Sequence, residues 1–326
     1  MKFSASSRPI ASVYDVIGDI HGHASALETL LRTLGYRRSG GGWHDPTGMR
    51  TVLFVGDIID RGPEIRRAVD IVRNMVDAGN AICVMGNHEY NALAWHTPDG
   101  AGGWLRSHTD EHLRQHAATL SAYRDDPGGL SDLLDWIRTL PLFYEDGALR
   151  VVHAAWDEPA IDEIRHDPRP VAQTDYLRVS MVPGRRESEI VERLLKGVEI
   201  RLPDGAVYHD KEGTPRTKTR TRWWLNADER TVGDGGRLTM GDVAMPPADT
   251  ELADVPVDPE ELEHLPGYRD HRPVFVGHYW LSGTPAPLTD RIACLDYSIA
   301  TGGRLCAYRF DGELPLTANR FVCVPG

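Results

Sequence analysis

The stretch FVGDIIDRGPE, Phe54 to Glu64, places two aspartates and an arginine directly after a run of hydrophobic residues. The preceding run, TVLFV, is typical of a buried strand. Burying a lone carboxylate at its end is costly unless cations or hydrogen bonds compensate the charge. A glycine at each end of the loop lets the backbone turn sharply. The stretch therefore predicts a buried strand that ends in a functional polar loop carrying Asp57, Asp60 and Arg61.

The surrounding sequence alternates between short hydrophobic runs and amphipathic stretches. In chain order these segments are SVYDVIGD, SALETLLRTLGY, TVLFVGD, IRRAVDIVRNMVDAG and AICVMGN. Their periodicities predict strand, helix, strand, helix and strand, and this order is typical of an α/β sheet with parallel strands. The polar clusters then fall at the carboxyl ends of strands, which is where open α/β sheets bind ligands.

The later part of the chain predicts further elements. Trp95 to Trp136 has a polar helical pattern, and RTLPLFYEDGALRVVHAAW predicts two strands that turn at Asp146-Gly147. Residues 159–272 are rich in charge, Pro and Gly, including an acidic segment at 242–268, and predict a loop-rich cap. PVFVGHYW and IACLDYSIATGGRLCAYRFDGE predict three more strands with a hairpin near Gly302-Gly303.

Composition limits the function classes. A formal net charge of -12 over 326 residues argues against a primary nucleic-acid or membrane-surface binder, because either would usually carry a basic patch. The four cysteines, Cys83, Cys294, Cys306 and Cys323, form no CxxC pair and suggest neither a zinc knuckle nor a dense disulfide framework. The first residues contain no apolar run typical of a signal peptide, and no later run reaches a membrane-spanning length. We therefore expect a cytoplasmic protein, and its oligomeric state stays open.

Five polar clusters lie at the predicted strand ends. They are GDIHG at 18–22, GDIIDRG at 56–62, GNHE at 86–89, VHAAW at 152–156 and GHYW at 277–280. One such cluster could be a simple turn or helix cap. Together they supply two aspartates, an asparagine and several histidines, and these oxygen and nitrogen donors suit Mn, Fe or Zn better than Ca. Two divalent ions that share a carboxylate can hold a hydroxide for in-line attack on phosphorus.

This set of motifs resembles the calcineurin-like metallophosphoesterases, and DRG with GNHE resembles their phosphoprotein phosphatase branch. The resemblance is specific over residues 13–95 and returns around 150–156 and 274–310. It implies an α/β sandwich with mixed central sheets flanked by helices, plus a loop-rich cap or insertion. We expect one domain over 10–326, with a helical insertion at about 95–140 and a variable cap at about 160–272.

The resemblance also implies roles for individual residues. Asp19 and His21 would bind the first metal ion, Asp57 would bridge both ions, and Asn87, His153 and His278 would complete the second site. His88 would be the general acid, Asp60 would orient it, and Arg61 would hold phosphate oxygens with its planar fork. The cofactor would be two divalent ions, manganese first, with Fe, Zn or Ni as alternatives.

A second basic element, TKTRTRWW, contains Arg220 and Arg222. It is similar to an element of the symmetrical diadenosine tetraphosphate hydrolases, where arginines approach the phosphate chain. The carboxyl-terminal motifs also resemble that subgroup. Those hydrolases commonly lack the second aspartate of DRG, which Asp60 supplies here. A solvated charged face is the alternative reading for the two arginines.

Simpler interpretations remain open for several residues. Arg61 could pair with Glu64 on the surface, and Trp156 could be a packing residue or a wall of the substrate cleft. His108, His112 and His116 share one predicted helix face, which could suggest a third metal. Because that helix is generally polar, we expect these three histidines to lie on a solvated face.

The leading hypothesis is a binuclear metal-dependent phosphoesterase that hydrolyses phosphomonoesters by attack of a metal-bridging hydroxide, as a serine/threonine protein phosphatase does. One alternative is a symmetrical dinucleoside polyphosphate hydrolase, and another is a metallophosphoesterase fold used as a non-catalytic binding scaffold. The expected partner is a phosphorylated protein or a small phosphoester or nucleotide substrate, with no primary nucleic-acid binding and no membrane.

Overall fold

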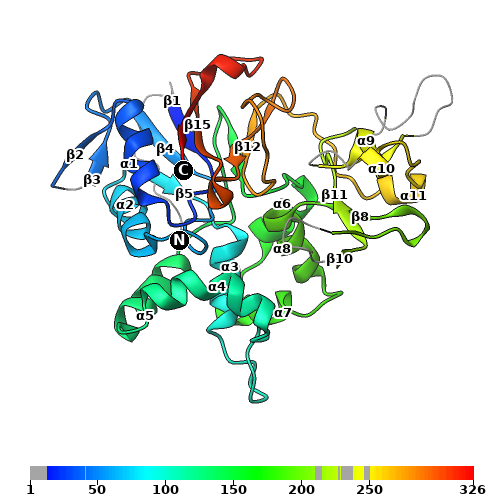
Figure 1. Ribbon diagram of the computed structural model, residues 1–326, viewed down its shortest axis with the longest axis horizontal. Helices are drawn as coiled ribbons and strands as arrows, with labels where there is room; N and C mark the ends of the chain where they lie inside the picture. The colour runs from blue at the N-terminus through cyan, green and yellow to red at the C-terminus, as the bar shows by residue number, and fades with distance from the viewer. Residues whose placement is uncertain (1–12, 41, 210–214, 227, 229–237, 246–249) are drawn as a thin grey trace.

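The computed structural model describes residues 13–40, 42–209, 215–226, 228, 238–245 and 250–326. Its largest sheet has the strand order β14-β15-β1-β4-β5, with β16 paired to the other side of β15 (Figure 1). The bounds are β1 Val13–Ile17, β4 Arg50–Phe54, β5 Ala81–Cys83, β14 Asp296–Tyr297, β15 Arg304–Phe310 and β16 Phe321–Pro325. The first three strands are parallel and β15 is antiparallel to β1, so the sheet is mixed, as the sequence predicts.

A second, four-stranded sheet has the order β13-β12-β7-β6. Its strands are β6 Phe143–Glu145, β7 Arg150–Val152, β12 Val274–Val276 and β13 Ile292–Cys294. β6 and β7 form the predicted antiparallel hairpin, whereas β12 is parallel to both of its neighbours. The strand prediction for the carboxyl-terminal part is confirmed for β12 and for the β14–β15 hairpin. The stretch IACLDY instead forms two strands, β13 and β14, in different sheets, and the prediction missed β16.

The two sheets pack face to face through one apolar cluster. It contains Val16 of β1, Leu53 of β4, Val151 of β7 and Phe275 of β12, all at most 1% exposed. Neighbouring residues such as Phe54 point to the opposite face, as the two-residue period of a strand requires. There they meet the helices, so the α/β sandwich is confirmed.

Helices α1 Ala24–Thr33 and α2 Ile65–Asp77 follow β1 and β4 and pack against each other. Each buries one stripe of aliphatic residues at helical spacing, for example Leu27, Leu30 and Leu31 of α1. A short hairpin, β2 Arg37–Ser39 with β3 Gly42–His44, lies between α1 and β4. The sequence patterns did not indicate this hairpin.

The next segment is helical where the pattern predicts it. α3 Asn87–Trp95 follows β5, and α4 Asp110–Ala122 and α5 Pro127–Ile137 come after a loop. Thr109 accepts a hydrogen bond from the backbone N–H of His112, and Asp126 caps α5 in the same way through Gly129. These caps fix where both helices begin.

The remaining elements lie between β7 and β12. They are α6 Glu158–His166, α7 Thr174–Ser180, α8 Arg186–Lys196, β8 Glu199–Arg201, η1 Pro203–Gly205, β9 Tyr208–His209, β10 Pro215–Arg216, β11 Lys218–Arg220, α9 Met240–Val243, α10 Thr250–Ala253 and α11 Pro259–Leu262. Figure 1 shows β8, β11 and α9 to α11 on the side away from α1 and α2. The first half of the expected cap therefore contains three helices, α6 to α8. Its second half consists of short elements joined by loops.

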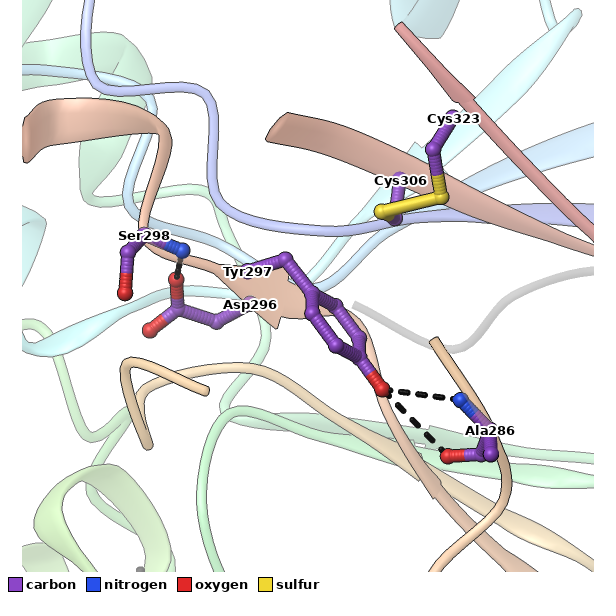
Figure 2. Close-up of a disulfide and its surroundings, with 6 residues drawn as sticks. All are labelled: Ala286, Asp296, Tyr297, Ser298, Cys306 and Cys323. Carbon is purple, nitrogen blue, oxygen red and sulfur yellow. Dashed lines mark hydrogen bonds between the residues drawn. A yellow bond between two sulfur atoms is a disulfide. The ribbon is translucent and has the colours of Figure 1, made fainter. Parts of the chain in front are cut away.

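A disulfide joins Cys306 of β15 to Cys323 of β16 (Figure 2). The two residues face each other directly in the antiparallel register, which brings their side chains within bonding reach. The short turns η2 Ile299–Thr301 and η3 Ala318–Arg320 precede these two strands. Disulfides persist mainly in oxidising compartments, so this bond is evidence against the expected cytoplasmic location, which stays a prediction. In the part of the chain that the structure describes, no helix is long and apolar enough to cross a membrane.

Candidate functional site

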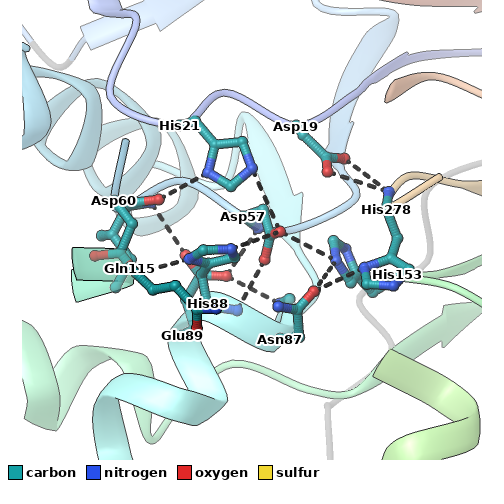
Figure 3. A network of polar contacts seen from close by, with 12 residues as sticks. Asp19, His21, Asp57, Asp60, Asn87, His88, Glu89, Gln115, His153 and His278 are labelled. Carbon is teal, nitrogen blue, oxygen red and sulfur yellow. Dashed lines mark hydrogen bonds and ion pairs between the residues drawn. The ribbon is translucent and has the colours of Figure 1, made fainter. Parts of the chain in front are cut away.

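The five predicted clusters meet at one edge of the two sheets (Figure 3). β1, β4 and β5 end there in the first sheet, and β7 and β12 end there in the second. The residues brought together are Asp19, His21, Asp57, Asp60, Asn87, His88, His153 and His278, and all except Asn87 are buried. The carboxyl-edge expectation from the strand order therefore holds for the whole set.

Backbone strain is concentrated in these loops. Seven non-glycine residues in the described ranges have positive φ, and six of them lie in the site loops. They include Asp57 at 52°, Asp60 at 68° and His278 at 71°. Such left-handed conformations cost about 1–3 kcal/mol each and persist where the surroundings over-determine them. The loops are therefore held in shape by the fold around them.

The first group of possible metal ligands is His21, Asp57 and His88. His21 Nε2 lies 3.5 Å from Asp57 Oδ2, and His88 Nε2 lies 4.0 Å from the same oxygen. The other ring nitrogen of His21, Nδ1, is 3.0 Å from the carbonyl oxygen of Ile59. That contact fixes the ring and leaves Nε2 directed at Asp57, which is how metal-binding histidines are usually held.

The second group is Asp57, His153 and His278, so Asp57 belongs to both. His153 Nε2 lies 3.4 Å from Asp57 Oδ2, while its Nδ1 is 2.7 Å from the carbonyl oxygen of Val55. Asn87 Oδ1 lies 3.1 Å from His153 Nε2 and 2.8 Å from His278 Nδ1. The three residues predicted for the second site thus surround one point beside Asp57.

Asp19, the predicted partner of His21, belongs to neither of these two ligand groups. Its carboxylate accepts a hydrogen bond from the backbone N–H of His278 at 3.1 Å. Burial, and then the negative charge of Asp296, hold the pKa of Asp19 well above its usual range. A nearby cation would act in the opposite direction, because it favours the charged carboxylate.

Several observations test whether these residues fit divalent ions. The Nε2 atoms of His21 and His278 are buried and have no hydrogen-bond partner among the residues the structure describes. Burial lowers the pKa of His153, but the charge of Asp57 outweighs it and raises the pKa to about 10. That charge would equally attract a metal ion, which competes with the proton for Nε2. Buried ring nitrogens that have no hydrogen-bond partner and surround one shared carboxylate fit two divalent cations such as Mn, Fe or Zn.

Asp60 lies on the other side of His88 from the shared carboxylate. Its Oδ2 is 2.7 Å from His88 Nδ1. Burial lowers the pKa of His88, yet the charge of Asp57 and the hydrogen bond to Asp60 together raise it above the ordinary value. A histidine held in this way can carry a proton near neutral pH.

Arg61 stacks on Trp280, with its guanidinium carbon 5.1 Å from the ring centre. Glu64, its alternative partner, instead forms an ion pair with Arg67 at 2.6 Å and accepts hydrogen bonds from Ser25. The guanidinium is therefore held near His278, two residues before Trp280, by an aromatic ring. A cation–π contact of this kind restrains its position beside the site.

The two arginines of β11 and its following turn act on different charged neighbours. After burial, the charge of Arg220 is the largest cause that lowers the pKa of His278, which indicates that Arg220 lies near this histidine. Its Nε is buried without a hydrogen-bond partner in the described ranges. Arg222 instead acts on Asp242 of α9, whose pKa it helps to lower after two hydrogen bonds from Thr239. Of the two, Arg220 is the one whose charge reaches a site residue.

Residues 14–201 match the family model described as calcineurin-like phosphoesterase, a span of more than half of the 326 residues. The chain belongs to the calcineurin-like phosphoesterase family. The resemblance found in the sequence motifs is thereby confirmed. Members of this family use divalent metal ions, in agreement with the two ligand groups around Asp57.

Two relatives within this family are named bis(5'-nucleosyl)-tetraphosphatases. The asymmetrical enzyme PrpE of Halalkalibacterium halodurans is 41% identical over 75 residues, which are 23% of this chain and 30% of that protein. A symmetrical enzyme of Aromatoleum aromaticum is 25% identical over 217 residues, which are 61% of this chain and 71% of that protein. The chain thus spans less than a third of the length of the first relative.

A solved structure extends the likeness over almost the whole chain. The protein serine/threonine phosphatase from Saccharomyces cerevisiae covers 97% of this chain and 80% of its own, with a TM-score of 0.50 and 12% sequence identity. At that identity the likeness shows a common fold. The metallophosphoesterase fold is therefore confirmed beyond the residues that the family model matches.

Sequence reasoning missed two buried acids that support the loops of the site. The carboxylate of Glu89 accepts hydrogen bonds from the backbone N–H groups of Asp57, Ile58 and Gly86 at 2.8–3.0 Å. Asp296 accepts one from the backbone N–H of Trp280 at 2.7 Å. Glu89 is visible in the motif GNHE, and Asp296 is visible in the motif LDY. Neither residue type reveals by itself that its hydrogen-bond partners are backbone N–H groups.

Two expectations about side chains are settled by packing. Trp156 is 1% exposed and lies under the guanidinium of Arg150 at 4.4 Å, so it is a packing residue. The expected solvated face of the three histidines is wrong for His116, which is 1% exposed and contacts Asp60. His108 stacks on Trp95 with ring centres 3.7 Å apart. His108 lies before α4 and is exposed, whereas His112 is half-buried, so the three histidines do not share one solvated face.

Proposed function

We propose that this chain is a phosphoester hydrolase that binds two divalent ions, manganese first, at the two ligand groups that share Asp57. The observation that carries the proposal is this sharing, because one carboxylate can then serve two neighbouring ions. His21 with Asp19 and Asp57 would hold one ion. Asn87, His153 and His278 with Asp57 would hold the other. When bound, such ions lower the pKa of coordinated water toward neutrality and polarise phosphoryl oxygens.

The other site residues have roles that follow from their positions. Arg61, restrained by Trp280, would bind phosphate oxygens through its planar fork. His88 would donate the proton from Nε2 to the departing oxygen, while its Nδ1–H remains bound to Asp60. Asp60 would keep the ring in that tautomer and orientation. These roles, and the single-domain assignment over 10–326 with insertions at about 95–140 and 160–272, are part of the proposal.

The His88–Asp60 pair favours esters of alcohols as substrates. An alkoxide is a poor leaving group, so it needs a proton as the bond to phosphorus breaks. A nucleotide phosphate leaves far more readily and needs that proton less. We therefore propose phosphomonoesters as the substrate class, including phosphoserine and phosphothreonine in proteins.

A second candidate is a dinucleoside polyphosphate. The charge of Arg220 acts on His278, and the buried Nε of Arg220 has no hydrogen-bond partner in the described part of the chain. Two separated guanidiniums, Arg61 and Arg220, would suit a chain of phosphates better than a single phosphate. The names of the two relatives point the same way for those proteins.

One experiment separates these candidates. Rates are measured with one Mn²⁺-loaded preparation on a phosphoserine peptide, a phosphotyrosine peptide and diadenosine tetraphosphate. A rate on the dinucleotide that exceeds both peptides by about a hundredfold, roughly 2.7 kcal/mol in transition-state stabilisation, would reject the monoester proposal. Failure to bind Mn²⁺, together with no turnover of an aryl phosphate, would favour the non-catalytic scaffold.

A further inference from the structure

The Asp60 carboxylate has more partners than its predicted role requires. While Oδ2 contacts His88, the other oxygen, Oδ1, lies 2.8 Å from His116 Nδ1 and 2.5 Å from Thr119 Oγ1. The Thr119 hydroxyl also accepts a hydrogen bond from the backbone N–H of Asp60 at 3.1 Å. Both carboxylate oxygens and the backbone of Asp60 are therefore held at once.

Both additional partners come from α4. His116 and Thr119 are three residues apart, which places them on one helix face, and they are 1% and 0% exposed. Buried polar side chains on a helix are costly unless they are hydrogen-bonded. Here both of them point to one carboxylate, whereas His112 on the same helix is half-buried and contacts the carbonyl oxygen of Ser107.

The direction of each hydrogen bond follows from the chemistry of the groups. An ionised carboxylate only accepts, so His88 and His116 both donate from Nδ1–H, and Thr119 donates from its hydroxyl. Donation from Nδ1 leaves Nε2 of His116 as an acceptor, and His96 Nε2 lies 3.2 Å from it. The imidazole of His116 is thus fixed at both ends.

We propose that His116 and Thr119 are positioning residues that act on His88 through Asp60, an inference that rests on the phosphoester hydrolysis proposed above. The side-chain torsion of an aspartate about its Cβ–Cγ bond is broad and roughly two-fold, so a carboxylate held at one oxygen can rotate. Two donors on Oδ1 stop that rotation. Oδ2 is then the oxygen presented to His88, and the ring of His88 is held with Nε2 toward Asp57 and the metal groups.

Four variants test this with matched pairs. Thr119→Val removes the hydroxyl and keeps the shape, whereas Thr119→Ser keeps the hydroxyl. His116→Leu removes the donor, whereas His116→Asn retains an N–H near the position of Nδ1. His112→Leu is the control on the same helix, because its side chain is only half-buried and contacts the carbonyl oxygen of Ser107 instead of Asp60.

The kinetic readout compares phenyl phosphate with 2,4-dinitrophenyl phosphate at saturating Mn²⁺. Loss of an outer-shell partner at a metal site typically costs about 10–100-fold, so we expect kcat of Thr119→Val and His116→Leu on phenyl phosphate to fall about tenfold. On the dinitrophenyl ester, whose leaving group hardly needs a proton, kcat should fall less than about twofold. The Ser and Asn variants and the His112→Leu control should stay within about twofold on both esters. Equal losses on the two esters would contradict the proposal.

A second readout needs no turnover. In the metal-free full-length chain, the hydrogen-bonded Nδ1–H proton of His88 is observed by nitrogen-15 NMR and assigned by its absence in His88→Gln. It should shift or broaden in Thr119→Val and His116→Leu, and stay in place in the Ser and Asn variants. An unchanged resonance in Thr119→Val would reject positioning by α4. If the unaltered chain hydrolyses neither ester, the proposed function fails, and this resonance alone decides whether α4 positions His88.

Discussion

Asp57 and Asp60 are three residues apart in one loop, yet their surroundings give them separate duties. Asp57 is ringed by His21, His88 and His153, while Asp60 contacts His88 from the other side. Burial raises the pKa of Asp57, but the charges of His153 and then His88 outweigh it and hold the pKa well below its ordinary value. An anionic Asp57 would attract divalent cations, which compete with the protons of these histidines.

The first prediction separates these two aspartates. We expect Asp57→Asn to weaken Mn²⁺ binding by more than about a hundredfold, because the shared carboxylate is lost. Asp60→Asn should retain Mn²⁺ and lower kcat by about 10²- to 10⁴-fold, as the loss of a general acid does. Calorimetric titration with Mn²⁺ and steady-state rates on phenyl phosphate measure the two effects. Equal loss of Mn²⁺ in both variants would contradict the separate roles.

The second prediction concerns Glu89, whose carboxylate accepts backbone hydrogen bonds from both the β4 loop and the turn before α3. In Glu89→Gln one oxygen becomes an NH₂ group that faces these N–H donors, so buried donors lose their acceptor. The free energy of unfolding should fall by about 2 kcal/mol in urea titrations. Glu192→Gln is the control, because Glu192 is an exposed residue of α8, and it should change stability by less than about 0.5 kcal/mol.

The loops that follow the strands approach each other closely, and this approach imposes a constraint that single residues do not reveal. The β4 loop passes directly over the turn at Gly86, where a Cβ atom would overlap both Oδ1 and the backbone nitrogen of Asp57. The absence of a side chain at Gly86 is therefore a condition for the position of the shared carboxylate.

Gly86→Ala is the third prediction. We expect the added methyl group to displace Asp57 and abolish high-affinity Mn²⁺ binding, and the accompanying strain should lower stability by about 1–3 kcal/mol. Gly147→Ala in the turn between β6 and β7 is a suitable control, because nothing lies within 4 Å of a Cβ there. Metal content after dialysis, measured for both variants, tests this. Retention of Mn²⁺ by Gly86→Ala would show that the loop can move aside.

The fourth prediction concerns the edge strand β16, which the disulfide ties to β15. The bond closes a loop of 17 residues, and such cross-links stabilise by about 3 kcal/mol through the unfolded state. Cys323→Ser should therefore unfold at a lower urea concentration than the unaltered chain. Dithiothreitol should lower the stability of the unaltered chain to a similar extent and leave Cys323→Ser unchanged, and an effect on both would indicate a cause other than this bond.

The strands and helices before residue 95 could be predicted because the hydrophobic periodicity agrees there with the glycine and aspartate residues that follow each strand. Ile17 and Phe54 end hydrophobic runs, and a glycine and an aspartate follow each run within three residues. The β2–β3 hairpin and β16 could not be predicted, because each depends on pairing that no short-range pattern reveals. For the same reason His116 was misjudged, since its burial comes from contact with a loop 56 residues away.

At the scale of the whole molecule, the possible metal ligands come from distant parts of the chain, from Asp19 to His278. Metal binding should therefore stabilise the fold as a whole. The fifth prediction is that excess Mn²⁺ raises the melting temperature by about 5–10 °C, which corresponds to roughly 2.7 kcal/mol at a hundred times Kd. A chelator should reverse the shift, and Asp57→Asn should show none. A shift of equal size in Asp57→Asn would place the stabilising ions elsewhere.

The position of β1 in the main sheet has a consequence for the synthesis of the chain. β1 pairs on one side with β4, which emerges soon afterwards, and on the other with β15, almost three hundred residues later. Synthesis proceeds from the N-terminus, so one edge of β1 stays unpaired until β15 has been made and is exposed to wrong partners in the meantime. The nascent chain likewise cannot complete its second ligand group before His278 emerges. Newly made protein would therefore acquire its full set of metal ligands only after His278 has been made, and growth in low metal would test this step of its maturation.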